Sequence, residues 1–274
     1  MVGKPIFTVS VSEEVYGDNA PITLQGGIRS GMETAARLGY EAVELQLHTP
    51  SSQNFQQFSD WAQALNIKIN AIGTGLESAV HHIHFSSPDI EIRKRIRKSF
   101  TEFIDGASIC RGSVFLGLCR GKAPSQAKKP EYLDRLAEEY RILAEYAGEK
   151  GVLLVLEPIV FYLTNLLNTT EEGLEFISRP GLETIKLLLD THHMFIEDKD
   201  MMDSFRKAAP KTGYIHISDS NRQYAGSGNV NYAEVGQILK ETGYEGPLAL
   251  ECLPVPTGIK AAEYSLDWMR KIWN

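Results

Sequence analysis

Four acidic or imidazole side chains follow short apolar runs in the second half of the sequence. They are Glu157 at the end of VLLVLE, Asp190 at the end of IKLLLD, His216 within GYIHI and Glu251 at the end of PLALE. Three carboxylates that converge without a cation would repel one another or take up protons, so such a set calls for a divalent metal ion. Oxygen ligands with a single imidazole favour Mn²⁺, Mg²⁺ or Co²⁺ over structural zinc, which prefers thiolates and several imidazoles.

These four positions can meet only if the chain brings consecutive strand ends together. Apolar runs alternate with helical periodicity along the sequence, which predicts eight strands and eight helices. The predicted strands span residues 6–11, 42–47, 67–72, 113–118, 152–156, 185–189, 213–217 and 247–250. The predicted helices span residues 30–38, 55–65, 89–110, 131–149, 170–177, 201–208, 232–241 and 260–272.

The alternation predicts an α/β fold, a single-domain (β/α)8 TIM barrel over residues 1–274. Strands joined by helical crossovers run parallel, and a closed barrel places its site at the C-terminal strand ends. An open doubly wound sheet usually carries a glycine-rich phosphate loop after an early strand, and no such motif occurs here. Residues 13–25, 73–87 and 121–130 are expected to be rim loops.

Composition argues against several other classes of protein. The net charge of −7 gives no attraction to a phosphate backbone, and the basic residues at 93–98 alternate with apolar ones as on a solvated helix face. No nucleic-acid partner is therefore expected. The sequence has neither a signal-type start nor a run of about 18 apolar residues, which predicts a cytoplasmic protein with no membrane partner. The three scattered cysteines exclude a four-cysteine zinc site.

The motifs around the four residues resemble those of the sugar isomerase and epimerase barrels related to xylose isomerase. They are LEP at Glu157, LLDTHHM at Asp190, HISDSNR at His216 and LALEC at Glu251. The resemblance is greatest to the D-tagatose 3-epimerase (ketose 3-epimerase) branch, including the 5-keto-L-gluconate epimerase type, which AIGTG and GLCRG after the third and fourth predicted strands also fit. It implies that these four residues bind one divalent ion, with Mn²⁺ ahead of Mg²⁺ and Co²⁺.

The resemblance also implies roles for individual side chains. Glu157 and Glu251 would be the acid/base pair, and His193 and Arg222 would hold oxygens of a small sugar substrate. Inversion of the carbon next to a ketone needs one base on one face and one acid on the other, with an enediolate between the two steps. An isomerase needs only one such base, so the predicted function is epimerisation of a ketose or keto-sugar acid.

Further candidates lie on the expected rim. Arg120 and Gly73 are predicted substrate contacts, and additional candidates for the cavity or its support are Glu44, His48 and His192. The run His81 to His84 lies in an expected loop, and no second metal site is expected there.

One departure bears on the substrate. The resembling branch carries a stretch of the type N-R-(F/Y)-E at the fifth strand, whereas this chain reads EPIVFYL and places Leu163 where the second glutamate is expected. The substrate is therefore expected to be more apolar or deoxygenated at that end, or activity on simple ketoses to be low.

Several alternatives stay open. Within the same superfamily they are an aldose–ketose isomerase and an inosose-type dehydratase, and outside the enzyme class a non-catalytic sugar-binding barrel. The endonuclease IV group shares similar motifs but also has a D-(R/K)-H motif, which is absent after Arg222. Relatives of this kind are often dimers or tetramers, so a homo-oligomer is expected.

Overall fold

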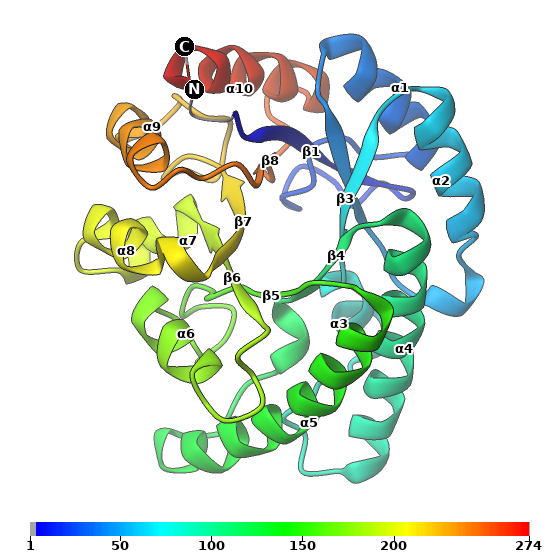
Figure 1. Cartoon of the computed structure of the whole chain (residues 1–274), viewed down its shortest axis with the longest axis vertical. Coiled ribbons are helices and arrows are strands. Elements are labelled where there is room, and N and C mark those ends of the chain that lie inside the picture. Colours follow the sequence, from blue (N-terminus) through cyan, green and yellow to red (C-terminus); the bar gives the residue numbers. More distant parts are fainter. Residues whose placement is uncertain (1–3, 274) are drawn as a thin grey trace.

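Eight parallel strands close into a barrel in sequence order, and helices cover its outside (Figure 1). The computed structural model of the protein describes residues 4–273. The strands are β1 (Ile6–Ser12), β2 (Ala42–Gln46), β3 (Lys68–Gly73), β4 (Ser113–Leu116), β5 (Leu154–Leu156), β6 (Lys186–Asp190), β7 (Thr212–Ile217) and β8 (Pro247–Leu250). The predicted TIM barrel is confirmed.

Eight long helices follow the strands where the periodicity predicts them. They are α1 (Ile28–Leu38), α2 (Phe55–Ala64), α4 (Ile90–Cys110), α5 (Lys129–Lys150), α6 (Thr170–Ile177), α8 (Met201–Ala208), α9 (Tyr232–Glu241) and α10 (Gly258–Trp273). Four short 3-10 turns lie in the connections between strands and helices: η1 (Pro50–Ser52), η2 (Leu118–Arg120), η3 (Gln126–Lys128) and η4 (Ala209–Lys211). No helix among residues 4–273 is long and apolar enough to span a membrane.

Two short helices were not predicted, and both lie on the rim that carries the site. Helix α3 (Gly75–His81) occupies part of 73–87, so the prediction of a loop there is wrong. Helix α7 (Thr191–Glu197) begins directly after β6 because the Asp190 carboxylate caps it, accepting hydrogen bonds from the backbone N–H groups of His192 and His193. Seven residues are too few to establish a helical period in a sequence.

The two-residue period of the strands decides which side chains face the barrel axis. The interior of the barrel is filled by Ala71, Phe115, Val155, Leu188, Tyr214 and Ala249. A second, larger cluster packs the outer strand faces against the helices. Four of these interior residues are each followed, two positions later, by a polar residue: Val155 by Glu157, Leu188 by Asp190, Tyr214 by His216 and Ala249 by Glu251. The strand period therefore directs all four side chains to the same axis at the C-terminal rim.

Candidate metal centre and active site

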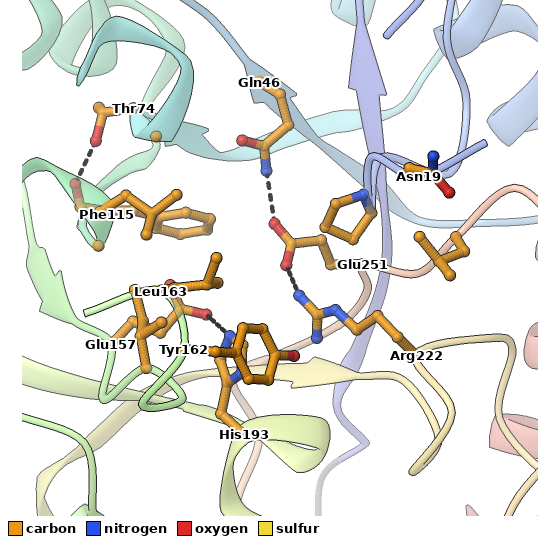
Figure 2. Close-up of a pocket in the computed structure, with 16 residues that line it drawn as sticks. Asn19, Gln46, Thr74, Phe115, Glu157, Tyr162, Leu163, His193, Arg222 and Glu251 are labelled. Atoms are coloured by element: carbon orange, nitrogen blue, oxygen red, sulfur yellow. Dashed lines mark hydrogen bonds and ion pairs between the residues drawn. The ribbon is translucent and has the colours of Figure 1, made fainter. Parts of the chain in front are cut away.

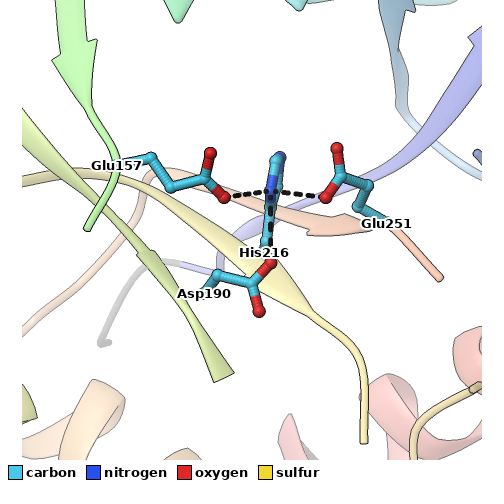
Figure 3. A group of neighbouring side chains, drawn as sticks. All are labelled: Glu157, Asp190, His216 and Glu251. Carbon is cyan, nitrogen blue, oxygen red and sulfur yellow. Dashed lines mark ion pairs between the residues drawn. The ribbon is translucent and has the colours of Figure 1, made fainter. Parts of the chain in front are cut away.

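Glu157, Asp190, His216 and Glu251 meet at one point. Their ligand atoms all lie within 4.8 Å of one another. The imidazole Nδ1 of His216 is 3.6 Å from Glu157 Oε1, 3.7 Å from Asp190 Oδ2 and 3.4 Å from Glu251 Oε2. Figure 3 shows Glu157 and Glu251 on opposite sides of the imidazole, with Asp190 in a third direction.

This set of atoms fits a divalent cation. His216 Nδ1 is buried and has no hydrogen-bond partner among the described residues, so the neutral ring can direct its lone pair at a cation held among the three carboxylates. Ligands held about 2.1 Å from one ion lie about 3.0 to 3.4 Å from each other in octahedral or tetrahedral geometry. The three distances from His216 Nδ1 to the carboxylate oxygens, 3.4 to 3.7 Å, are close to that range, and all pairs of ligand atoms lie within 4.8 Å.

The electrostatics of the site also favour a cation. Burial opposes protonation of His216, but the carboxylates of Glu44 and Glu251 outweigh it and raise the His216 pKa well above its usual value. Burial raises the pKa of Glu157, and the nearby imidazole offsets only part of that rise. Burial would also raise the pKa of Glu251, but His216 and Arg222 lower it. Positive charge is thus strongly stabilised at the point where the four residues meet.

A cavity of about 240 Å³ opens above these residues (Figure 2). Glu157 and Glu251 line it, whereas Asp190 and His216 are each 1% exposed. Further polar residues of the wall are Asn19, Gln46, Thr74, His193 and Arg222. Apolar side chains dominate the rest of the wall: Pro21, Phe115, Leu118, Ile159, Leu163 and Leu253, together with Tyr162.

The structure places two of the predicted substrate contacts, His193 and Arg222, in the cavity wall. His193 is buried, and burial lowers its pKa to about 3, so its ring is neutral near pH 7. Its Nδ1 has no hydrogen-bond partner in the described part of the chain. Arg222 donates hydrogen bonds to Glu251 (Figure 2), to Asp190 and, at 2.8 Å, to the Ser218 hydroxyl.

Arg120 does not lie in the cavity wall, although it was predicted to contact the substrate. Its side chain is fully buried and does not line the cavity. The guanidinium donates hydrogen bonds to five backbone carbonyls, those of Leu116, Gly117, Glu157, Leu166 and Leu167. These hydrogen bonds join the ends of β4 and β5 to the following loop, and a substrate contact by Arg120 stays a prediction.

Gly73 is also absent from the cavity wall. A side chain at this position would collide with the amide of Gln46. Gly73 therefore leaves space for Gln46, whose Nε2 lies 3.2 Å from Glu251 Oε1. The sequence analysis missed Gln46, although it lies two residues after Glu44 and so faces the same side of β2.

The other two histidine candidates do not line the cavity, although His192 contacts Tyr162, which does. His48 contacts the hydroxyl of Thr49 at 2.9 Å, and His192 Nε2 lies 3.1 Å from the hydroxyl of Tyr162. Within residues 4–273, the four strand-end residues form a group that could hold a metal ion, and the segment 81–84 contains no such group.

Three carboxylates and an imidazole lie at the C-terminal rim of an eight-stranded parallel barrel, which is where enzymes with this fold have their active sites. Residues 32–272 match the sequence model of the xylose isomerase-like TIM barrel family, and the chain belongs to this family.

Known proteins of this family include sugar epimerases that are similar to the chain over most of its length. It is 34% identical over 252 residues to the L-ribulose 3-epimerase of Methylomonas sp. (strain DH-1), which covers 90% of this chain and 86% of that protein. It is 27% identical over 230 residues to the D-psicose 3-epimerase of Ruminiclostridium cellulolyticum, over 80% of this chain and 76% of that protein.

A solved structure agrees with these relatives. The crystal structure of a D-allulose 3-epimerase from Methylomonas sp. in complex with D-allulose matches the barrel with a TM-score of 0.83 and 25% identity, over 98% of this chain and 97% of that chain. The predicted family and the predicted class of enzyme, an isomerase, are confirmed.

Proposed function

We propose that this chain is a metal-dependent ketose 3-epimerase, which inverts the carbon next to the ketone of a ketose. The observation that carries the proposal is the placement of Glu157 and Glu251 on opposite sides of His216 in one cavity (Figure 3). The relatives named L-ribulose 3-epimerase and D-psicose 3-epimerase support the same reaction.

Glu157, Asp190, His216 and Glu251 would hold one divalent ion, and we propose Mn²⁺, with Mg²⁺ and Co²⁺ as alternatives. When bound, the ion supplies Lewis-acid stabilisation of the negative charge that develops on the substrate oxygens. One glutamate carboxylate takes the proton from C3 on its own face of the sugar. The other glutamate returns a proton from the opposite face, so that the configuration at C3 is inverted. In the reverse reaction the two glutamates exchange roles.

His193 and Arg222 would hold the sugar while the proton moves. The neutral ring of His193 donates a hydrogen bond to a substrate oxygen without adding charge beside Glu157, which lies 3.8 Å from its Nε2. Arg222 holds Asp190 and Glu251 with two of its nitrogen atoms and has five N–H donors in all, so donors remain for a substrate oxygen.

Two other enzyme functions are less well supported. An aldose–ketose isomerase or an inosose-type dehydratase would use the same metal site, but neither needs a glutamate on each face of the substrate. A non-catalytic sugar-binding barrel would have no need for two carboxylates within reach of one reacting carbon.

From the resemblance we further propose a homo-oligomer, dimer or tetramer, which light scattering in solution tests.

The test is product analysis by NMR after incubation with L-ribulose, D-psicose and other ketoses in the presence of Mn²⁺. We expect the C3 epimer of at least one ketose, and loss of the activity when a chelator is added. An aldose product would replace the proposal with an isomerase, and loss of water would replace it with a dehydratase. Sugar binding without any turnover would support the non-catalytic barrel.

A further inference from the structure

We infer that Glu44 and Gln46, both on β2, are positioning residues for the metal centre. Glu44 orients the imidazole of His216, and Gln46 orients the carboxylate of Glu251. The inference rests on the proposed function, because it assigns a role to two residues through the ligands of the proposed metal ion.

Glu44 lies on the far side of the His216 ring from the other carboxylates. Its side chain is fully buried, and its Oε2 is 3.0 Å from His216 Nε2 and 3.0 Å from the Tyr214 hydroxyl. A hydrogen bond from Nε2–H to Glu44 places the proton of a neutral imidazole on Nε2. It therefore leaves the Nδ1 lone pair directed at Glu157, Asp190 and Glu251. Carboxylates that hold the second nitrogen of a metal-binding histidine fix its tautomer and its orientation in this way.

Gln46 connects this carboxylate to the acid/base pair. Its Nε2 is 3.1 Å from Glu44 Oε1 and 3.2 Å from Glu251 Oε1, so the two N–H groups of one amide hold two carboxylates. Figure 2 shows the contact with Glu251. Glu251 is thereby fixed through Oε1, while its Oε2 faces the imidazole of His216. The absence of a side chain at Gly73 provides the space in which the amide lies.

A purely structural role does not account for these residues. Glu44 lies beside the apolar interior layer of the barrel, a place that branched apolar residues usually fill. A buried carboxylate is costly unless donors surround it, and packing alone is served as well or better by an apolar residue. The donors that surround Glu44 are Gln46, Tyr214 and His216, and two of these three lead directly to the metal centre.

The first test measures Mn²⁺ affinity by titration calorimetry and by electron paramagnetic resonance of free Mn²⁺. We expect Glu44→Gln to raise the Kd about 10- to 100-fold, the range for removal of such partners. Glu139→Gln is the matched control, because Glu139 is a buried carboxylate on α5 paired with Arg93 and Arg97, outside the cavity. This control is expected to lower the thermal unfolding temperature without changing the Kd.

The second test separates Gln46 from Glu44. We expect Gln46→Leu to lower kcat about tenfold with KM nearly unchanged, because Glu251 loses its fixed orientation while the four ligands stay in place. Its Mn²⁺ Kd is expected to rise less than that of Glu44→Gln. A purely structural role would lower the unfolding temperature and leave the kcat of the folded fraction at the value of the unaltered protein.

The outcomes distinguish this inference from the proposed function. Unaltered protein that binds none of Mn²⁺, Mg²⁺ and Co²⁺ would overturn the proposed function. Tight Mn²⁺ binding by the unaltered protein together with an unchanged Kd in Glu44→Gln would overturn the role of Glu44 alone. An unchanged kcat in Gln46→Leu would overturn the role of Gln46.

Discussion

At the scale of single residues, Glu157 and Glu251 show how a strand period becomes a reaction geometry. Each lies two residues beyond an interior residue, Val155 or Ala249, and so points to the barrel axis. The strands β5 and β8 are not neighbours in the barrel, and the two carboxylates therefore approach His216 from opposite sides. Polar residues at strand ends were sufficient to predict this group from the sequence.

Contacts between residues far apart in the sequence were not predictable in the same way. Nothing in the sequence around Arg120 indicates that its guanidinium is fully buried among backbone carbonyls, because these partners carry no side-chain signal. The role of Gly73 likewise depends on Gln46 from the neighbouring strand. Strand periodicity assigns a face to each residue but does not identify its partner across the barrel.

Leu163 carries a prediction about the substrate. It lines the cavity with Leu118 and Ile159, where a distal hydroxyl of a sugar would find no hydrogen-bond partner among these three side chains. Burying a hydroxyl unpaired costs about 1–3 kcal/mol, and the lower half of that range applies here because Leu118 and Leu163 are 37% and 47% exposed. We therefore expect kcat/KM for ketoses that lack a hydroxyl at that end to exceed that of their hydroxylated counterparts by about tenfold.

Leu163→Gln should reduce this preference, because its amide can pair with the hydroxyl. Leu163→Met, which is similar in volume and apolar, should keep it. Kinetics on matched deoxy and hydroxylated ketoses measure the effect, and equal kcat/KM values in the unaltered protein would contradict it.

At the scale of elements, the alternation of apolar runs and helical patterns was sufficient to predict all eight strands and the eight long helices. The short helices α3 and α7 were not predicted, because seven residues carry little helical periodicity. Helix α7 depends on Asp190, which caps it through Oδ1 while Oδ2 faces the metal centre. The same carboxylate thus fixes a helix start and offers a ligand atom.

A prediction about stability follows from Arg120, because its guanidinium joins the ends of β4 and β5 to the loop at 166–167. Arg120→Met would leave several buried carbonyls without donors, and we expect a loss of about 3 kcal/mol or more in the free energy of unfolding. Denaturant unfolding of the metal-free protein measures it. Unchanged stability with a raised KM would instead support the substrate contact that the sequence analysis expected.

At the scale of the whole molecule, the candidate metal centre links five strands of one barrel. Strands β5 to β8 each supply one of the four residues, on the strand or directly after it. Strand β2 supplies Glu44, which contacts His216 across the barrel interior. A ligand that binds the folded state alone stabilises it by about 2.7 kcal/mol at a concentration of 100 times its Kd.

We therefore expect saturating Mn²⁺ to raise the thermal unfolding temperature by several degrees and a chelator to reverse the change. Differential scanning calorimetry measures both shifts. Asp190→Asn removes the charge of one proposed ligand and should abolish most of the response. An equal rise in that variant would indicate that Mn²⁺ acts elsewhere on the protein.

The central claim is that Glu157 and Glu251 move a proton on opposite faces of one substrate carbon. The most direct measurement is deuterium incorporation at C3 of a ketose in D₂O with Mn²⁺, followed by NMR, for the unaltered protein, Glu157→Gln and Glu251→Gln. We predict deuterium in the inverted product of the unaltered protein and no epimerisation by either variant. Inversion at an undiminished rate in one of the two variants, or inversion without deuterium in the unaltered protein, would contradict the claim.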